Sequence, residues 1–351
     1  MLDNVEQRNA LLTAIEKARG SSVIAYMLHD NAVIADDALP HLYDKLHALG
    51  KRERIDLLVS ARGGVPEVCW RMISLMREYC DHLGVIIGTR VQGAASLLAL
   101  GADEIVMGPI SELGSVDSIR KHPLLPRDEQ GQPLPVSVGE LRGLTRFLSG
   151  DTAPQKSVGG SYDEGQKAAK GAARDNDAPN LGSLDPGVVT ALLQYIHPLA
   201  IAHLHQADAL SRDLTRKALQ RHMHVEDNEL VERLVDLFNG GFQSPLYTAG
   251  RAEAAGLGLH VEEAEKDAWS SIWGLVQLYQ AALYSDRPDP TVPGAFFRYV
   301  CIIESVGRST GLHQSYTQHE GQERVVQIRW ETAVRGPGPG PSYGPGGISN
   351  N

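Results

Sequence analysis

The chain opens with short apolar runs that alternate with longer stretches in which apolar residues recur every three or four positions. Continuous branched runs are typical of buried strands, and the longer periodic stretches are typical of amphipathic helices. The predicted strands are Ser22–Leu28, Ile55–Val59, Val85–Ile87 and Glu104–Met107. The predicted helices between them run from Asp36–Asp37 to Leu49, from Val65 to His82, and onward from Ser96. Strands joined by such helices pair in parallel, so we predict an α/β fold whose sheet is covered on both faces.

The pattern changes between residues 123 and 186, where Gly, Pro, Ser, Asp and Lys dominate around one predicted helix, Val138–Leu148. Residues 150–185 are expected to form a long polar loop. The helices predicted after it are Val188–His205, Asp208–Met223, Asp227–Phe238, Ala249–Leu257 and Glu262–Leu283, and the last predicted strands are Phe296–Ser305 and Glu323–Thr332. We therefore expect a core (1–125), a helix with a mobile loop (126–185), a helical region (186–285), a small β-rich C-terminal extension (286–335) and a disordered Gly/Pro tail (336–351).

Composition narrows the classes of partner. The 351 residues carry a formal charge of −10, from 33 basic and 43 acidic side chains, which argues against a nucleic-acid partner. Three cysteines without metal-ligand spacing indicate neither a disulfide framework nor a zinc site, and they fit a reducing cytoplasm. The charged N-terminus does not resemble a signal peptide, and the longest apolar stretch is interrupted by charges, so no membrane span is expected.

One serine stands where a nucleophile would be useful. Ser96 follows the small residues Gly93-Ala94-Ala95 and begins an apolar helix, whose positive end favours developing negative charge. The strand from Ile55 runs into Gly63-Gly64, a turn whose free backbone N–H groups suit an oxyanion. The alternative is a purely structural role, in which Ser96 only caps a helix, as many serines do. If the two turns lie side by side, they form half of an acyl-transfer site.

The residues around this pair match a known family. The run Ala-Asp-Glu-Ile-Val-Met-Gly-Pro (102–109) followed by Leu-Gly-Ser-Val-Asp (113–117) resembles the serine dehydrogenase proteinase family. That family belongs to the Clp protease and crotonase superfamily and is related to signal peptide peptidase A. The resemblance covers residues 20–265 and is strongest in 55–117. Further matches in the same order are residues 136–142, 196–201, 211–214 and 250–259.

The resemblance implies a fold and a reaction. The fold would be a Clp/crotonase-like spiral of ββα units with a helical arm, for which residues 186–238 are the candidate, packed in a homo-oligomer. Ser96 would be the nucleophile, and Gly64, beside Gly63, and Leu97 would supply the oxyanion amides. The reaction would be cytoplasmic hydrolysis of peptides or unfolded protein, without a cofactor or metal.

The sequence leaves the identity of the general base open. Relatives of signal peptide peptidase place a lysine some tens of residues after the serine, and other members use histidine with aspartate. Asp117 lies near the position of the histidine in Clp relatives, where it would orient a base, position substrate or cap a turn. His197 matches a histidine of the family's His-Pro-Leu helix. The candidates for the base are Lys121, His122, Lys156, Lys167, Lys170 and His197, and among the lysines Lys156 is our choice.

Two other functions compete with a peptidase. A crotonase-like acyl-CoA enzyme would share the oxyanion geometry but give Ser96 no role. A non-catalytic, partner-binding scaffold is suggested by Ser244-Pro-Leu-Tyr247, which stands where many relatives have a Ser-His-Asp-His-like stretch. A nicotinamide cofactor is not supported, because no GxGxxG motif follows a strand.

Overall fold

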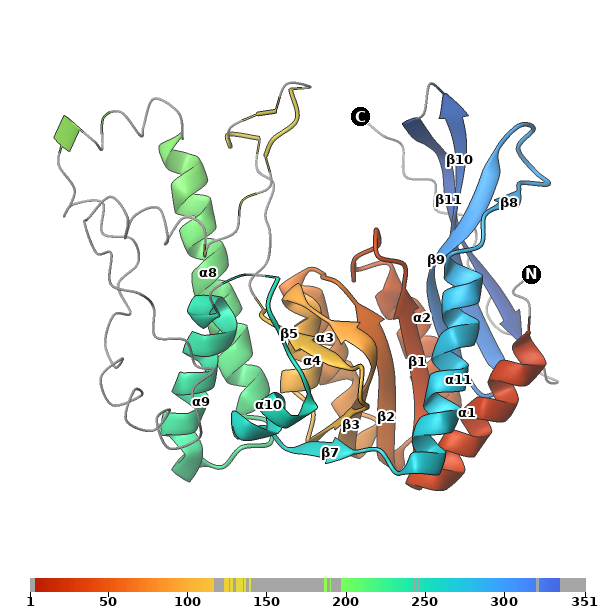
Figure 1. Cartoon of the computed structure of the whole chain (residues 1–351), viewed down its shortest axis with the longest axis horizontal. Helices are drawn as coiled ribbons and strands as arrows, with labels where there is room; N and C mark the ends of the chain where they lie inside the picture. The colour runs from red at the N-terminus through yellow and green to blue at the C-terminus, as the bar shows by residue number, and fades with distance from the viewer. Residues whose placement is uncertain are drawn as a thin grey trace.

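The computed structural model describes residues 4–116, 197–242, 246–319 and 322–334, together with residue 244 and short pieces between 123 and 190. These residues build one sheet in the order β11-β10-β9-β1-β2-β3-β4-β7, with β5, β6 and β8 attached to it (Figure 1). The strands are β1 Ser22–Leu28, β2 Arg52–Ala61, β3 Cys80–Val91, β4 Glu104–Met107, β5 Glu112–Gly114, β6 Thr248–Ala249, β7 Val261–Glu263, β8 Arg287–Pro288, β9 Phe296–Ser305, β10 Arg308–His319 and β11 Gln322–Val334.

The sheet has a parallel part and an antiparallel part. Strands β1, β2, β3, β4 and β7 pair in parallel, as the alternation of strands and helices predicts. Strand β9 pairs with β1 in antiparallel fashion, and β10 and β11 continue the sheet outward. The α/β class is thus confirmed. The β-rich C-terminal segment is also present, and it extends the same sheet as the core.

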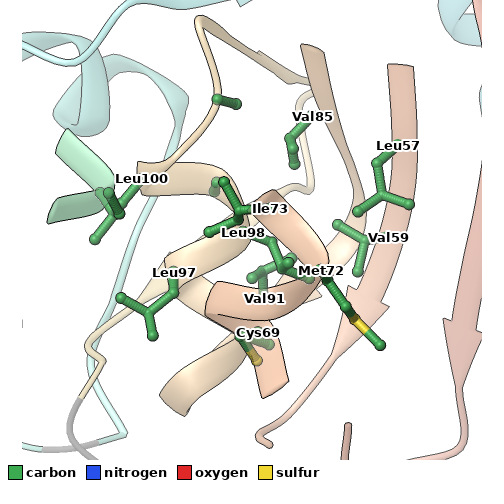
Figure 2. Packing of buried hydrophobic residues seen from close by; sticks show 14 of the residues in the cluster. Leu57, Val59, Cys69, Met72, Ile73, Val85, Val91, Leu97, Leu98 and Leu100 are labelled. Carbon is green, nitrogen blue, oxygen red and sulfur yellow. The ribbon is translucent and has the colours of Figure 1, made fainter. Parts of the chain in front are cut away.

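Helices cover both faces of the parallel part. On one face lie α2 (Ala38–Leu49), α3 (Pro66–Arg77) and α4 (Ser96–Leu100), and on the other lie α1 (Val5–Arg19) and α11 (Lys266–Leu283). Alternate residues of β2 serve the two layers: Leu57 packs toward α3, while Leu58 packs toward α11. Figure 2 shows the first of these cores, where leucines of α4 meet Met72 and Ile73 of α3.

Three further helices lie beside α4 (Figure 1). They are α8 (Pro198–Leu219), α9 (Asn228–Asp236) and α10 (Arg251–Gly256). The C-terminal half of α8, with Leu214 and Ala218, joins the core that contains α4. Its N-terminal half, with Ala200 and Leu204, packs instead on Leu125. Among the described helices, none combines the length and the apolar character needed to cross a bilayer.

The sequence predictions agree with the structure in some elements and differ in others. The limits of β1, β4 and β9 are as predicted. The helix predicted over 65–82 ends at Arg77, because β3 already begins at Cys80. The break predicted between residues 205 and 208 is wrong, since α8 runs through it. Helix α1 and strand β10 were not predicted. The predicted helix 138–148 apart from Gly139, the whole loop 150–185 and the tail 336–351 lie outside the described residues.

A buried ion pair attaches the first helix to the antiparallel part of the sheet. Arg8 of α1 donates from Nε to Glu304 of β9 at 2.7 Å, and both side chains are fully buried. Tyr279 of α11 donates to the same carboxylate at 2.8 Å. Because Glu304 is buried, its charge depends on these two donors. The three elements are therefore joined at one carboxylate.

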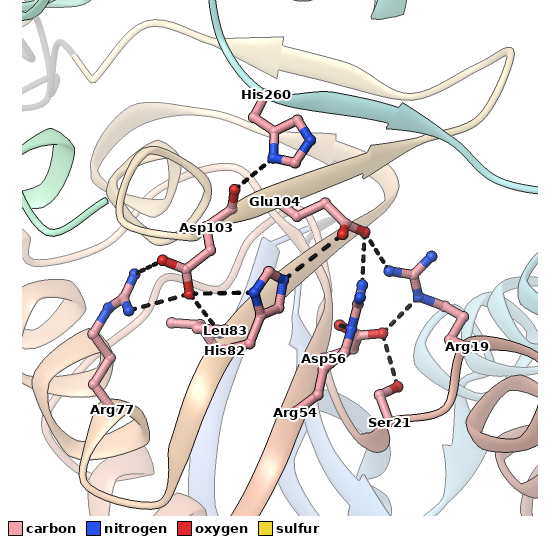
Figure 3. Close-up of polar contacts among 10 residues, drawn as sticks. All are labelled: Arg19, Ser21, Arg54, Asp56, Arg77, His82, Leu83, Asp103, Glu104 and His260. Carbon is pink, nitrogen blue, oxygen red and sulfur yellow. Dashed lines mark hydrogen bonds and ion pairs between the residues drawn. The ribbon is translucent and has the colours of Figure 1, made fainter. Parts of the chain in front are cut away.

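A second polar network lies at the amino ends of the parallel strands (Figure 3). Arg54 donates to Glu104 at 2.7 Å, and Arg19 at the end of α1 donates to both Asp56 and Glu104. Farther along, Asp103 accepts two bonds from Arg77. These ionic contacts join α1, α3 and three strands at the edge opposite the one where β2 and β3 run into Gly63-Gly64 and Ser96.

Replacing Arg8 by methionine should leave the Glu304 carboxylate buried without its hydrogen bonds from the guanidinium. We expect the free energy of unfolding, measured by urea denaturation, to fall by about 3–5 kcal/mol. The matched control is Arg71→Met, because Arg71 pairs with Asp36 at 2.6 Å on the surface. That change should cost less than about 1 kcal/mol. Equal losses in the two variants would show that the Arg8–Glu304 pair does not hold α1 in place.

Helix α2 is tied to the hairpin β10–β11 through a buried lysine. Lys45 is 2% exposed and donates from Nζ to Thr310 Oγ1 at 2.7 Å. Nearby, Trp330 of β11 donates to Asp37 at the start of α2. Burial lowers the pKa of Lys45 to about 8, because the charged amine loses its water. Keeping the buried amine charged at neutral pH therefore costs the folded state free energy.

This lysine predicts a pH dependence of stability. Between about pH 8 and the ordinary lysine pKa, the unfolded chain binds the proton more tightly than the folded one, so stability should rise with pH. The unfolding free energy of the wild type should gain up to about 3 kcal/mol relative to Lys45→Met over this range. Lys217→Met, which removes an exposed lysine, is the control. The difference in unfolding free energy between the wild type and this variant should not change over the same pH range. A difference in unfolding free energy between the wild type and Lys45→Met that does not change with pH would show that burial does not lower the pKa of Lys45.

Candidate active site

The first part of the candidate site is the turn after β2. Ile34 N–H donates to Gly63 O at 3.1 Å, and Val65 N–H donates to Ile34 O at 2.9 Å. This bridge pattern directs the N–H of Gly64 away from Ile34. A Cβ on Gly64 would lie 2.8 Å from Ile34 Cβ and 3.2 Å from Cys69 Sγ. Only glycine fits there, so the turn is held close to the segment that carries Ile34.

The second part is the turn after β3, and it touches the first. Gly93 has φ +58°, and a Cβ on it would lie 3.3 Å from Gly63 Cα and 3.4 Å from Arg62 O. The preceding residue, Gln92, donates its N–H to Ala61 O at 3.0 Å. The expectation that the two turns lie side by side is therefore correct, and backbone meets backbone with no side chain between them.

Ser96 follows directly and begins α4. Its side chain is fully buried, and Oγ donates to Val91 O and to Ser115 O, each at 3.3 Å. These are long bonds for a hydroxyl, whose usual distance is near 2.8 Å. Figure 2 shows how the apolar residues Leu97 and Leu98 of α4 fix the helix in the core. Ser96 is thus held at the end of β3 by its helix, while its own hydrogen bonds are weak.

Ser115 brings a third strand end to the site. It follows β5, which pairs with β3 through Leu113 and Val91. A Cβ on Gly114 would lie 2.6 Å from Gln92 Cγ and 3.3 Å from Gln92 Cα, so this strand also approaches closely. Ser115 could not be predicted from the sequence as a contact of Ser96, because the acceptor is a main-chain carbonyl and carries no side-chain signal.

The stretch that departs from the family pattern lies beside β5. Strand β6, which follows Tyr247 directly, pairs with β5 through Thr248 and Gly114. The Tyr247 hydroxyl donates to Glu253 at 2.6 Å, and this bond raises the pKa of Tyr247 to about 12. Tyr247, the last residue of this stretch, therefore lies close to the strand that leads to Ser115, and the sequence has no histidine from Ser244 to Tyr247.

The cysteine beside the glycine turn does not compete with Ser96. Cys69 is buried in α3, and burial raises the pKa of its thiol far above the ordinary value. A thiol in this state is not a nucleophile, since the thiolate is the reactive form. Ser96 remains the candidate nucleophile at the two turns.

The structure gives His197 another contact. His197 precedes α8 and is exposed, and its Nδ1 accepts a hydrogen bond from Leu199 N–H at 3.1 Å, as an N-cap does. The end of α8 that packs beside α4 is about 30 Å farther along the helix, at 1.5 Å per residue. The described contacts of Ser96 do not include His197.

The remaining candidates for the base and its orienting group lie outside the described residues. They are Asp117, Lys121, His122, Lys156, Lys167 and Lys170. In the described part of the chain, Ser96 Oγ contacts main-chain carbonyls and no lysine or imidazole. The described residues also contain no group of three metal-ligating side chains arranged to hold an ion.

Comparisons with known proteins give weak structural neighbours. No family model and no curated protein matches the chain. Two structures of the 1510-N membrane-bound stomatin-specific protease align at a TM-score of 0.26 and 12% identity, covering 39% of this chain and 62% and 65% of the protease chains. A probable enoyl-CoA hydratase/isomerase from Mycobacterium abscessus aligns at a TM-score of 0.23 and 14% identity, over 74% of this chain and 86% of that one. This chain spans less than two thirds of the protease chains, and likenesses at this level carry no functional argument.

The two glycines of the first turn offer a matched pair of variants. Gly64→Ala should lower the free energy of unfolding by about 1–3 kcal/mol, because the added methyl group collides with Ile34. Gly63→Ala should be nearly neutral, since its methyl group would meet only Val33 Cγ1 at 3.9 Å. Denaturant titration measures both. Equal losses would show that the close approach at Gly64 is not the constraint described here.

Proposed function

We propose that the protein is a serine peptidase that cleaves peptide bonds through an acyl-enzyme on Ser96. The observation that carries the proposal is the contact between Gly93 and Gly63, which brings the serine turn against the glycine turn. With that contact, the outward N–H of Gly64 and the N–H of Leu97 are the candidate donors to an oxyanion. Such donors stabilise the charge that develops on a carbonyl under attack.

In the proposed reaction Ser96 Oγ attacks the carbonyl carbon of the scissile peptide bond and loses its proton to a general base. The base is one of the candidates that the family resemblance offers, with Lys156 preferred among the lysines and Asp117 as the group that would orient it. The carbonyl oxygen becomes the oxyanion, and the amine leaves with a proton returned by the base. Water then hydrolyses the ester. The 3.3 Å bonds of Oγ are weak enough to be exchanged for a bond to the base.

The same proposal includes the finer features expected from the family resemblance. The parallel part of the sheet with α2, α3 and α4 would be the Clp/crotonase-like spiral. Helices α8 and α9 would form the arm of a homo-oligomer. Peptides or unfolded proteins in the cytoplasm would be the substrates, with no cofactor.

A fluorophosphonate probe tests the nucleophile, because it modifies serines that are activated by a base and an oxyanion site. We expect labelling of the wild type and its loss, at least tenfold, in Ser96→Ala, read by intact-protein mass spectrometry. Ser309→Ala is the control, since that buried hydroxyl has no described partner and lies in β10. Labelling that survives in Ser96→Ala would remove Ser96 as the nucleophile.

A second candidate is a scaffold of the same fold that binds a partner and has no catalytic activity. The specific observation in its favour is that Ser96 is fully buried and donates to two main-chain carbonyls. A serine in that state performs a structural task at the start of α4. The labelling experiment separates the two functions, because a purely structural Ser96 would leave the wild type unmodified.

A further inference from the structure

Strand β11 forms one end of the sheet and is paired on one side only (Figure 1). It runs antiparallel to β10, and among the described residues no strand pairs with its outer side. Its 13 residues make it the longest of the described strands. Such an edge offers a row of backbone N–H and C=O groups to a further strand. The outer side of β11 is therefore a candidate surface for contact with another chain.

The strand carries few of the features that keep sheet edges apart. The usual ones are lysines, prolines and bulges. Residues 322–334 contain no lysine and no proline, and the register shift in their pairing with β10 is a bulge at Val326. All side chains of residues 322–329 are exposed, and Ile328 among them is 61% exposed. The edge therefore combines exposed apolar side chains with backbone groups that can pair.

Trp330 shows which side chains share a face of this strand. Its Nε1 donates to Asp37 at 3.1 Å, and its ring packs on His41 with the ring centroids 4.2 Å apart. Trp330 therefore lies on the face of the sheet that carries α2. Because side chains alternate along a strand, Ile328 and Thr332 lie on that face too.

The two neighbours of Trp330 carry opposite charges and lie on the other face. Arg329 donates to His313 of β10, and Glu331 accepts from the Tyr299 hydroxyl at 3.0 Å. Both charged side chains are nevertheless exposed. The sequence Arg-Trp-Glu therefore places one positive and one negative charge symmetrically about an aromatic residue.

This arrangement is complementary to itself. When two identical strands pair in antiparallel fashion about a two-fold axis, the axis passes between a residue and its own copy, and positions equally far on either side face each other. With the axis at Trp330, Arg329 faces the partner's Glu331, and the two tryptophans face each other. Opposite charges and aromatic pairs at facing positions stabilise a sheet, whereas like charges destabilise it. With the axis one residue away, Arg329 or Glu331 would face its own copy.

We infer that two copies of this chain pair through β11, so that their sheets join into one across a two-fold axis at Trp330. Residues 327–333 of each copy form the new pair of strands, on the regular side of the bulge at Val326. The sequence after β11 offers no competing strand, because residues 336–341 have proline, which lacks the N–H, at every second position. The inference does not depend on the chemistry of Ser96, and its interface differs from the proposed helical arm of α8 and α9.

Sedimentation velocity of the full chain over a range of concentrations tests the interface through its charges. We expect the wild type to form a dimer. Arg329→Glu and Glu331→Arg each place like charges opposite one another, so each variant alone should dimerise at least about tenfold more weakly. An equimolar mixture of the two variants should recover the dimer, because every charge then faces its opposite in the other chain. Recovery in the mixture also shows that both variants fold.

Two further variants serve as a second test and as a control. Ile328→Lys places an amine at an exposed position beside the tryptophan pair, so it should weaken the dimer by a similar factor and leave urea unfolding of the monomer unchanged. Lys217→Glu, at an exposed lysine of α8, should leave the dimer intact. A monomeric wild type, or a dimer that tolerates all three changes in β11, would overturn the inference. In the second case, loss of the dimer in Lys217→Glu would place the contact on α8.

Discussion

The approach of two backbone turns at the carboxyl ends of β2 and β3 is the constraint on which the rest of the site depends. Gly93 lies so close to Gly63 that a Cβ on Gly93 would meet Gly63 Cα at 3.3 Å, in a backbone with φ +58° that favours glycine. The parallel register of β2 and β3 fixes this contact. Ser96, which follows Gly93 by three residues, and Gly64, which follows Gly63, are placed by it.

The surrounding structure keeps this edge of the sheet in position. Apolar packing of α4 on α3 fixes the start of α4, so Ser96 does not rely on its own long hydrogen bonds (Figure 2). At the opposite edge, the network around Glu104 joins α1 to the parallel strands (Figure 3). On the far side, Glu304 joins α1, α11 and β9. Buried charges are concentrated at the amino ends of the strands, and glycines with small residues at the carboxyl ends, where backbones must approach.

The sequence predicts those features that follow from local pattern. The strands with continuous branched residues, such as Ser22–Leu28, could be predicted directly, whereas the contact between the two glycine turns was a condition that the register of β2 and β3 meets. Helix α1 was missed because its apolar face is narrow, and Arg8 is buried through an ion pair nearly 300 residues away in the chain. Strand β10 was missed because Ser, Thr and Gln fill it, and its place in the sheet comes from pairing with β9 and β11.

The site was predicted less completely than the fold, for similar reasons. Ser96 and Gly64 carry side-chain or glycine signals, whereas the contact of Ser96 with the carbonyl of Ser115 arises only from strand pairing. His197 shows how ambiguous a side-chain signal is, because a histidine before a proline can serve equally well as an N-cap. A side chain can be given a role in the site only after the fold shows which other groups lie next to it.

The most direct test of the central claim is a crystal structure of the protein after reaction with a fluorophosphonate. The account predicts a phosphorus–oxygen bond to Ser96 Oγ, with the phosphonyl oxygen about 2.7–3.1 Å from the amide nitrogens of Gly64 and Leu97. An unmodified Ser96, or a phosphonyl oxygen that faces away from Gly64, would contradict it.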